Sequence, residues 1–184
     1  MSGEATPERL RLFVACDLPG DVADAVTRWQ EHELRRHHDL RLAPTLHLTL
    51  AFLGEVATAR VPDLQRVLGE IAWPPAVCTF REPLFLPAHG KRRVVALELD
   101  DPAGALRRLR EEVARGLAAE GLYEPEKRPW LPHVTVARFR HPGHPFSLQN
   151  VNIPAFGVVR MVLYSSHLER AGAVHAPIAD FPAS

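Results

Sequence analysis

A chain of 184 residues that is 46% hydrophobic is long enough for one substantial core and short for two independent domains. Its 22 basic and 22 acidic residues give a formal charge of zero, which excludes a globally cationic protein that binds nucleic acid or anionic membranes through its overall charge. The two cysteines, Cys16 and Cys78, lack C-x-x-C spacing and predict neither a disulfide framework nor a metal knuckle. We therefore expect one cytoplasmic unit without a signal peptide or a membrane span.

The first part of the chain is expected to alternate between strands and helices. Residues 10–18 predict a buried strand, and 19–21 supply a turn and an N-cap for a helix that ends within 35–39. Residues 46–52 alternate strictly, which predicts a strand with Phe52 on its leucine face. The apolar face expected for the helix comprises Val22, Ala25, Val26 and Trp29.

The later segments continue this pattern. Strands are expected at 79–86 and 94–100, with a loop between them. Asp101 is expected to cap a third helix that ends before Gly121. The apolar residues expected to define the second and third helices are Leu64, Val67, Leu68 and Ile71, and then Leu106, Leu109, Val113 and Leu117.

The C-terminal part is expected to contain two more strands. The first begins at His133 and alternates, so that Ala137 shares the histidine face and Arg138 points elsewhere. Residues 141–154 hold three prolines and little periodicity, which predicts a long surface loop. Residues 158–165 predict the second strand.

Two of the expected strands carry the same five-residue template. Residues 47–51 (HLTLA) and 133–137 (HVTVA) both contain histidine, an aliphatic residue, threonine, an aliphatic residue and alanine. The recurrence of the whole template argues against coincidence and indicates an internal duplication. Two pseudo-symmetric lobes would bring both histidine faces to one cleft.

The residue types in this template suit the hydrolysis of a cyclic phosphodiester without a metal. Imidazole is both neutral and cationic near pH 7, so His47 and His133 can serve as a general acid and a general base. Thr49 and Thr135 lie about 7 Å further along the same faces and can donate hydrogen bonds to phosphoryl oxygens. Their residue types alone leave open which histidine is the acid.

The histidines could also be structural, bind zinc or be solvated. A single histidine beside apolar residues is more often structural than catalytic, but its repetition favours catalysis. A zinc site is disfavoured because neither motif has H-x-H or H-x-x-x-H spacing. The histidines expected to be solvated are His37, His38, His141 and His144.

With these motifs the chain resembles the two-histidine (2H) phosphoesterase superfamily, in particular its RNA 2′,3′-cyclic phosphodiesterase branch, long called 2′-5′ RNA ligases. Residues 11–15 resemble its opening strand and 162–168 its closing strand. Residues 47–54 and 132–138 resemble its two HxTx signatures, so the resemblance spans most of the chain.

The resemblance implies an α/β (α+β) fold that is bilobal and duplicated, with two mainly antiparallel sheets and outer helices around a central cleft. Residues 1–184 would form this single domain, with one HxTx motif per lobe. His47 would be the proton donor and His133 the proton acceptor. The implied reaction is metal-independent hydrolysis of RNA 2′,3′-cyclic phosphate ends to 2′-phosphomonoesters, with weak reverse 2′-5′ ligation.

The resemblance implies no cofactor and no metal. The expected partner is RNA with a 2′,3′-cyclic phosphate end, tRNA fragments being one candidate. We expect a cytoplasmic monomer with no membrane association and no obligatory protein partner.

Several further residues are candidates for substrate binding. Arg128 precedes the second motif and presents a fork of donors to phosphate or ribose oxygens, although an exposed, solvated arginine is the alternative. Phe52 and Trp130 offer ring faces on which a base can stack, with core packing as the alternative. The chain departs from the family with Trp130 where Phe is usual, and with His175 after Gly172 where the family commonly has a tyrosine.

Two other functions remain open from the sequence. One is a phosphodiesterase for a small cyclic nucleotide or an ADP-ribose cyclic phosphate, which would prefer mononucleotides to oligonucleotides. The other is a non-enzymatic RNA-end binder, although Arg or Lys would serve simple affinity better than two imidazoles.

Overall fold

A computed structural model describes residues 8–169 and 172–184. All strand pairings in these ranges are antiparallel, and the nine-stranded sheet has the order β7-β4-β5-β6-β3-β1-β8-β9, with β2 also paired to β6. The fold is therefore α+β. The elements are β1 (Arg9–Asp17), α1 (Gly20–Leu34), β2 (Leu40–Leu42), β3 (His47–Ala57), a 3-10 turn η1 (Thr58–Arg60), α2 (Val61–Gly69), β4 (Ala76–Leu86), β5 (Arg92–Asp100), α3 (Ala105–Ala119), β6 (His133–Gly143), β7 (Phe156–Val158), β8 (Arg160–Glu169) and β9 (Gly172–Pro182).

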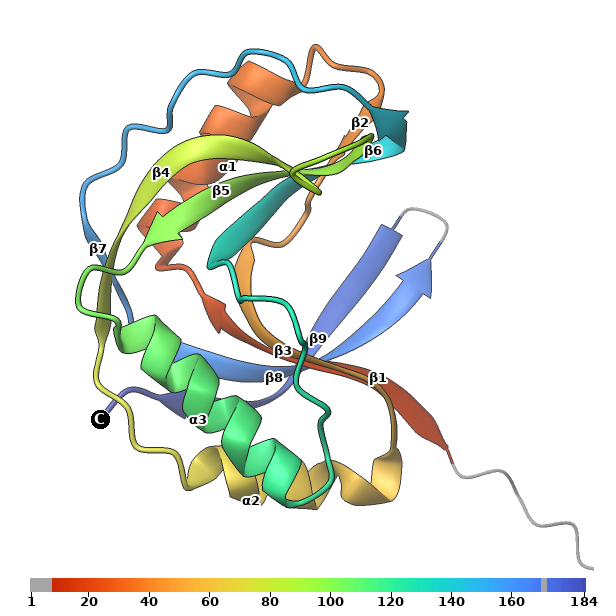
Figure 1. Ribbon diagram of the computed structural model, residues 1–184, viewed down its shortest axis with the longest axis vertical. Coiled ribbons are helices and arrows are strands. Elements are labelled where there is room, and N and C mark those ends of the chain that lie inside the picture. The colour runs from red at the N-terminus through yellow and green to blue at the C-terminus, as the bar shows by residue number, and fades with distance from the viewer. Residues whose placement is uncertain (1–7, 170–171) are drawn as a thin grey trace, which may run out of the picture.

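The sheet is strongly curved and has two halves (Figure 1). One half contains β2, β4, β5, β6 and β7, with α1 packed against it, and the other contains β1, β3, β8 and β9, next to α2 and α3. The halves meet where Leu48 of β3 pairs with Val134 of β6. The two sheets expected from the sequence are thus joined through this contact into one.

The helix α1 shows how amphipathic spacing builds the core. Val22 and Val26 are buried, as their spacing predicts, while Trp29 is only half-buried. The helix also buries Gln30 and Glu33, which the apolar pattern did not indicate. Buried polar groups require hydrogen-bond partners, so these two side chains connect α1 to other segments. None of the helices in the described ranges is long and apolar enough to cross a bilayer.

The start of α3 differs from the expectation. Its N-cap is Gly104, whose φ of 68° lies in the left-handed region, and not Asp101. The Asp101 carboxylate still contributes, because it accepts hydrogen bonds from the backbone N–H groups of Ala105 at 3.0 Å and Arg107 at 3.2 Å. A carboxylate that binds free N–H groups at a helix N-terminus is favourable for both hydrogen bonding and the helix dipole.

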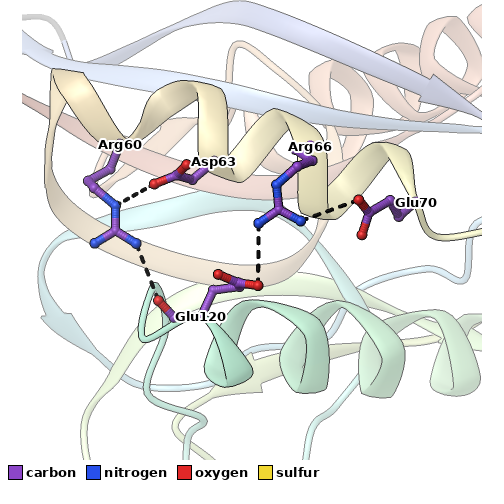
Figure 2. A network of polar contacts seen from close by, with 5 residues as sticks. All are labelled: Arg60, Asp63, Arg66, Glu70 and Glu120. Atoms are coloured by element: carbon purple, nitrogen blue, oxygen red, sulfur yellow. Dashed lines mark hydrogen bonds and ion pairs between the residues drawn. The ribbon is translucent and has the colours of Figure 1, made fainter.

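The helices α2 and α3 are connected by a surface network (Figure 2). Arg66 of α2 lies 3.3 Å from the carboxylates of both Glu70 and Glu120, the latter directly after α3. Arg60 contacts the Asp63 carboxylate at 2.7 Å and donates to the backbone oxygen of Glu120 at 3.3 Å. Because these groups are exposed, each pair contributes little, and buried apolar contacts hold the helices.

The segment expected to be a surface loop is anchored to the core. Strand β6 continues to Gly143, and Val151 further along is buried. Gln149 joins the segment to α1, because its backbone oxygen accepts from Trp29 Nε1 at 3.0 Å and its N–H donates to Glu33 at 3.1 Å. This second hydrogen bond also lowers the pKa of the Glu33 carboxyl.

The expectation that His37 is solvated is also wrong. Its ring stacks on Phe146 with centroids 3.9 Å apart, and its Nε2 is buried without a partner. His38, His141 and His144 are exposed, as expected.

Candidate active site

The two histidine motifs lie side by side at the junction of the two halves. The junction pair is formed by Leu48 and Val134, the second residue of each motif. The pairing is antiparallel, so the two motifs run in opposite directions from this point. They are therefore related by an approximate two-fold axis through this pair.

Both motifs contain a β-bulge at their fourth position. Along β3, Thr49 pairs with Ala15 of β1 and Ala51 with the preceding residue, Val14, which leaves Leu50 without an opposite residue. Along β6 the pairing with β5 passes from Thr135 to Ala137 in the same way. An extra residue in one strand reverses the alternation of the side chains that follow it.

The bulges change which side chains face the site. Ala51 and Ala137 are buried in the core instead of sharing the histidine faces. Phe52 and Arg138 line the cavity with the catalytic candidates, so the expectations that Phe52 shares the leucine face and that Arg138 points elsewhere are wrong. Strict period two fails here because it assumes an uninterrupted strand.

A buried glutamine from α1 satisfies the backbone at the second bulge. Gln30 is 2% exposed, and its Nε2 donates to the backbone oxygen of Val136 at 2.7 Å and to that of Ala43 at 3.2 Å. The backbone N–H of Ala43 also donates to Val136 at 2.9 Å. Gln30 thus joins α1 to the bulge and to the turn that follows β2, and both border the cavity.

The cavity itself has a volume of ≈ 440 Å³. It is lined by β1, β2 with the turn that follows it, β3, β6, β8 and β9, and its lining includes His47, Thr49, Phe52, Thr135, Arg138 and His175. A volume of this size suits a nucleotide-sized ligand. His133 is half-buried and is not among the lining residues, but it begins the strand that meets β3 at the Leu48–Val134 pair.

The cavity is strongly cationic although the chain is neutral overall. Its ionisable lining residues are Arg11, Arg41, Arg138, His47 and His175, with no carboxylate among the lining residues described. Burial first, and then the charges of Arg41 and Arg11, lowers the pKa of Arg138. The Arg11 guanidinium also lies 4.8 Å from the centre of the Phe52 ring. Such a cavity attracts an anion.

His47 is enclosed by other rings. Its ring centroid lies 5.0 Å from that of Phe13 and 5.3 Å from that of His175. Burial, followed by the charges of His175, Arg138 and His133, lowers the pKa of His47 from 6.5 to about 4. His47 is therefore neutral near pH 7 in the unliganded protein.

His133 has a different environment, which determines its tautomer. Its Nδ1 lies 2.8 Å from the backbone oxygen of Leu131. A carbonyl oxygen can only accept, so Nδ1 carries the hydrogen and donates it. In the neutral ring Nε2 then holds a free lone pair, which can accept a proton.

Two predicted substrate residues lie away from the cavity lining. Arg128 is exposed in the segment before β6, and Trp130 is half-buried against the core. The indole Nε1 of Trp130 donates to the backbone oxygen of Thr49 at 3.1 Å, so this ring supports the first motif from outside the cavity. Arg11 and Arg41 do line the cavity, and we did not select either from the sequence. The resemblance of residues 11–15 to the opening strand of the family was the one sequence signal that could have indicated Arg11.

Within residues 8–169 and 172–184, no group of three or more His, Cys, Asp or Glu side chains is arranged to hold a metal ion. Cys16 and Cys78 are both buried and free. Burial raises the pKa of each thiol, that of Cys78 to about 12, so neither is a candidate nucleophile.

The chain is similar in sequence to a known protein family and to several of its members. The profile described as the 2′-5′ RNA ligase superfamily matches residues 18–152, which include both motifs. The RNA 2′,3′-cyclic phosphodiesterase of Escherichia coli (strain K12) is 28% identical over 178 residues, covering 93% of this chain and 95% of that protein. That of Aeropyrum pernix is 36% identical over 94 residues, covering 51% of this chain and 53% of that protein.

Solved structures are similar over almost the whole chain. TT0787 of Thermus thermophilus has a TM-score of 0.83 and 26% identity, covering 94% of this chain and 97% of that one. E. coli LigT complexed with 3′-AMP also has a TM-score of 0.83 and 26% identity, covering 96% of this chain and 99% of that one. The similarity therefore includes both halves of the sheet.

Proposed function

The chain belongs to the 2′-5′ RNA ligase superfamily, and we propose that it is an RNA 2′,3′-cyclic phosphodiesterase. The observation that carries this proposal is the meeting of two HxTxA strands at the Leu48–Val134 pair, beside a cationic cavity without carboxylates. Relatives named for this activity and the complex of LigT with 3′-AMP support it. The substrate is RNA with a 2′,3′-cyclic phosphate end, and the product is a 2′-phosphomonoester.

In the proposed mechanism His133 is the general base and His47 the general acid. Water attacks the phosphorus while Nε2 of His133 takes its proton. The bond between phosphorus and the 3′ oxygen breaks, and His47 gives a proton to that departing oxygen. The hydrogen bond from His133 Nδ1 to Leu131 supports this order, because it leaves Nε2 free to accept.

The low pKa of His47 must rise before this residue can donate a proton. Burial first, and then the charges that His175, Arg138 and His133 can carry, lower this pKa and keep the imidazole neutral near pH 7. A bound phosphate brings a negative charge that offsets those neighbours, and this raises the pKa of His47. The substrate thereby promotes protonation of the acid that acts on it.

The threonines and the cavity arginines are proposed to hold the substrate. Thr49 and Thr135 both line the cavity, where their hydroxyl groups can donate to phosphoryl oxygens. Arg138 adds a cation beside them, and Phe52 offers an exposed ring, 44% accessible, for a base. Arg128 is exposed and the indole N–H of Trp130 donates to the backbone of Thr49, so we propose no contact with the reacting phosphate for either.

Several wider features belong to the same proposal. The chain is proposed to act as one bilobal domain with one motif per half, as a monomer, and to catalyse weak reverse 2′-5′ ligation. tRNA fragments are candidate substrates. The two buried free cysteines agree with a reducing, cytoplasmic location.

The test is turnover of a short oligoribonucleotide that ends in a 2′,3′-cyclic phosphate, measured in EDTA. We expect a 2′-phosphate product, and a loss of about 10²- to 10⁴-fold in kcat for His47→Ala and for His133→Ala, since each removes one proton-transfer group. His141→Ala is the matched control, because this histidine is exposed on the same strand as His133. If both active-site variants keep parental turnover, the proposed mechanism fails. If the parent binds the RNA without turnover, the chain is an RNA-end binder.

A further inference from the structure

A third histidine lies at the site, on the last strand. His175 of β9 pairs with Ser166 of β8, and both line the cavity. Its ring lies edge-on to those of His47 and Phe13, with centroid distances of 5.3 Å and 4.9 Å. His175 therefore lies next to the proposed general acid, on the half of the sheet that does not contain β6.

The surroundings of the ring determine which nitrogen can meet a ligand. Nδ1 of His175 is buried and has no hydrogen-bond partner. A buried N–H without an acceptor is more costly than a bare lone pair, so the neutral ring carries its hydrogen on Nε2. Nε2 is then a hydrogen-bond donor on a residue that lines the cavity.

We propose that His175 is a substrate-binding residue whose Nε2–H donates to a phosphoryl oxygen of the RNA end. The 5.3 Å between the His175 and His47 rings allows both to contact one phosphate, His47 at the departing oxygen and His175 at a non-bridging oxygen. This inference rests on the proposed function and adds to it a phosphate contact from β9, which neither HxTx motif supplies.

Burial and the charges around His175 favour its neutral form. The groups that face it are Arg11 from β1, His47 from β3 and Arg138 from β6. Burial, then Arg138 and Arg11, lowers the pKa of His175 in the unliganded protein. The ring is therefore neutral near pH 7, and its Nε2–H can donate to an anion without a proton on the buried Nδ1.

The kinetic test replaces the ring without removing its bulk. His175→Phe keeps an aromatic ring beside His47 and Phe13 but loses both nitrogens. We expect it to raise KM for the oligonucleotide by about tenfold or more, with a smaller change in kcat, because the lost bond to a charged oxygen acts in both ground and transition states. His167→Phe is the matched control, since His167 is exposed on the same hairpin. A parental KM in His175→Phe would overturn the proposal.

A second measurement is independent of turnover. Sulfate keeps its charge between about pH 5 and 9, and its binding can be followed by NMR of the imidazole nitrogens. In the parent we expect sulfate to shift the Nε2 resonance of His175, and in His175→Gln we expect weaker sulfate binding. If His175→Phe does not fold, sulfate binding by His175→Gln decides the outcome. A His175 resonance that sulfate does not shift would overturn the inference. If sulfate shifts this resonance but the RNA is not hydrolysed, only the proposed function is contradicted.

Discussion

At the scale of single residues, two motifs of one template acquire different chemistry from their surroundings. His47 is packed against the rings of Phe13 and His175, and its burial, followed by the charges of its neighbours, lowers its pKa to about 4. His133 donates from Nδ1 to a backbone oxygen, which leaves Nε2 free. The asymmetry that a general acid and a general base require thus comes from the neighbours of the motifs and not from the motifs themselves.

The cationic neighbours of His47 lead to a first prediction. Arg138→Gln removes one of the charges that oppose its protonation, so the pKa of His47 should rise toward 6.5. NMR titration of the imidazole nitrogens would measure this. Arg140→Gln is the control, because Arg140 is exposed on the same strand outside the cavity lining. A pKa unchanged by Arg138→Gln would show that burial and the other neighbours keep it low without Arg138.

Trp130 and Phe52 should respond in opposite ways to substitution. Trp130→Phe removes the indole N–H that donates to Thr49, so the free energy of unfolding should fall by about 1 kcal/mol with little change in KM. Phe52→Ala removes an exposed ring from the cavity, so KM should rise while stability changes little. Urea unfolding and steady-state kinetics on both variants would test this. A large rise in KM for Trp130→Phe would place Trp130 at the substrate.

At the scale of elements, the matched bulges orient the site. Each bulge follows the threonine of its motif and turns the sixth residue, Phe52 or Arg138, toward the cavity. Gln30 binds the carbonyl oxygen of Val136 at the second bulge, so α1 supports the strand that carries Arg138. The arrangement depends on backbone polar groups being satisfied where the ladder is interrupted.

Replacement of Gln30 tests the importance of that support. Gln30→Leu keeps the size of the side chain but leaves the backbone oxygens of Val136 and Ala43 without its amide, so the free energy of unfolding should fall by about 1 to 3 kcal/mol. Thermal or urea unfolding would measure the loss. Gln149→Leu, at an exposed side chain, should have a much smaller effect. Equal stability of parent and Gln30→Leu would show that water replaces the amide.

At the scale of the whole molecule, curvature of one sheet concentrates charge in a neutral protein. Two halves joined at the Leu48–Val134 pair bring arginines from β1, β2 and β6 around one cavity. The formal charge of zero therefore conceals a local cationic site.

The burial of the His47 imidazole makes the free energy of unfolding of the whole protein depend on pH. The pKa of His47 is lower in the folded state than in the unfolded chain, so the unfolded state binds more protons as pH falls from 6.5 toward 4. Stability should decline over this window by at most about 3 kcal/mol from His47, and less in His47→Gln. His175, whose pKa is also lowered, contributes in the same direction. Urea unfolding at pH 7, 5.5 and 4.5 would measure the difference, and parallel curves for parent and variant would contradict it.

Much of the fold was predictable because hydrophobic spacing is a local property. The strand at 10–18, most of the apolar faces of the three helices and the two motif strands follow from periods of 2 and 3.6, whereas Ile71, expected in the second helix, lies beyond the end of α2 at Gly69. The short strand β2 was not predicted, because three residues are too few to show a period. The start of α3 was placed too early, because Asp101 binds the N–H groups of the helix N-terminus from outside the helix.

By itself the sequence determined the repeated HxTxA template, the residue types that suit phosphoryl chemistry and the family to which the chain belongs, since these depend only on residue identity and spacing. Only the tertiary structure decided that Arg138 and Phe52 face the cavity, that Trp130 lies outside its lining, and that Arg11 and His175 join it. Those placements depend on bulges that reverse side-chain direction and on strands far apart in the chain, and no local pattern encodes either.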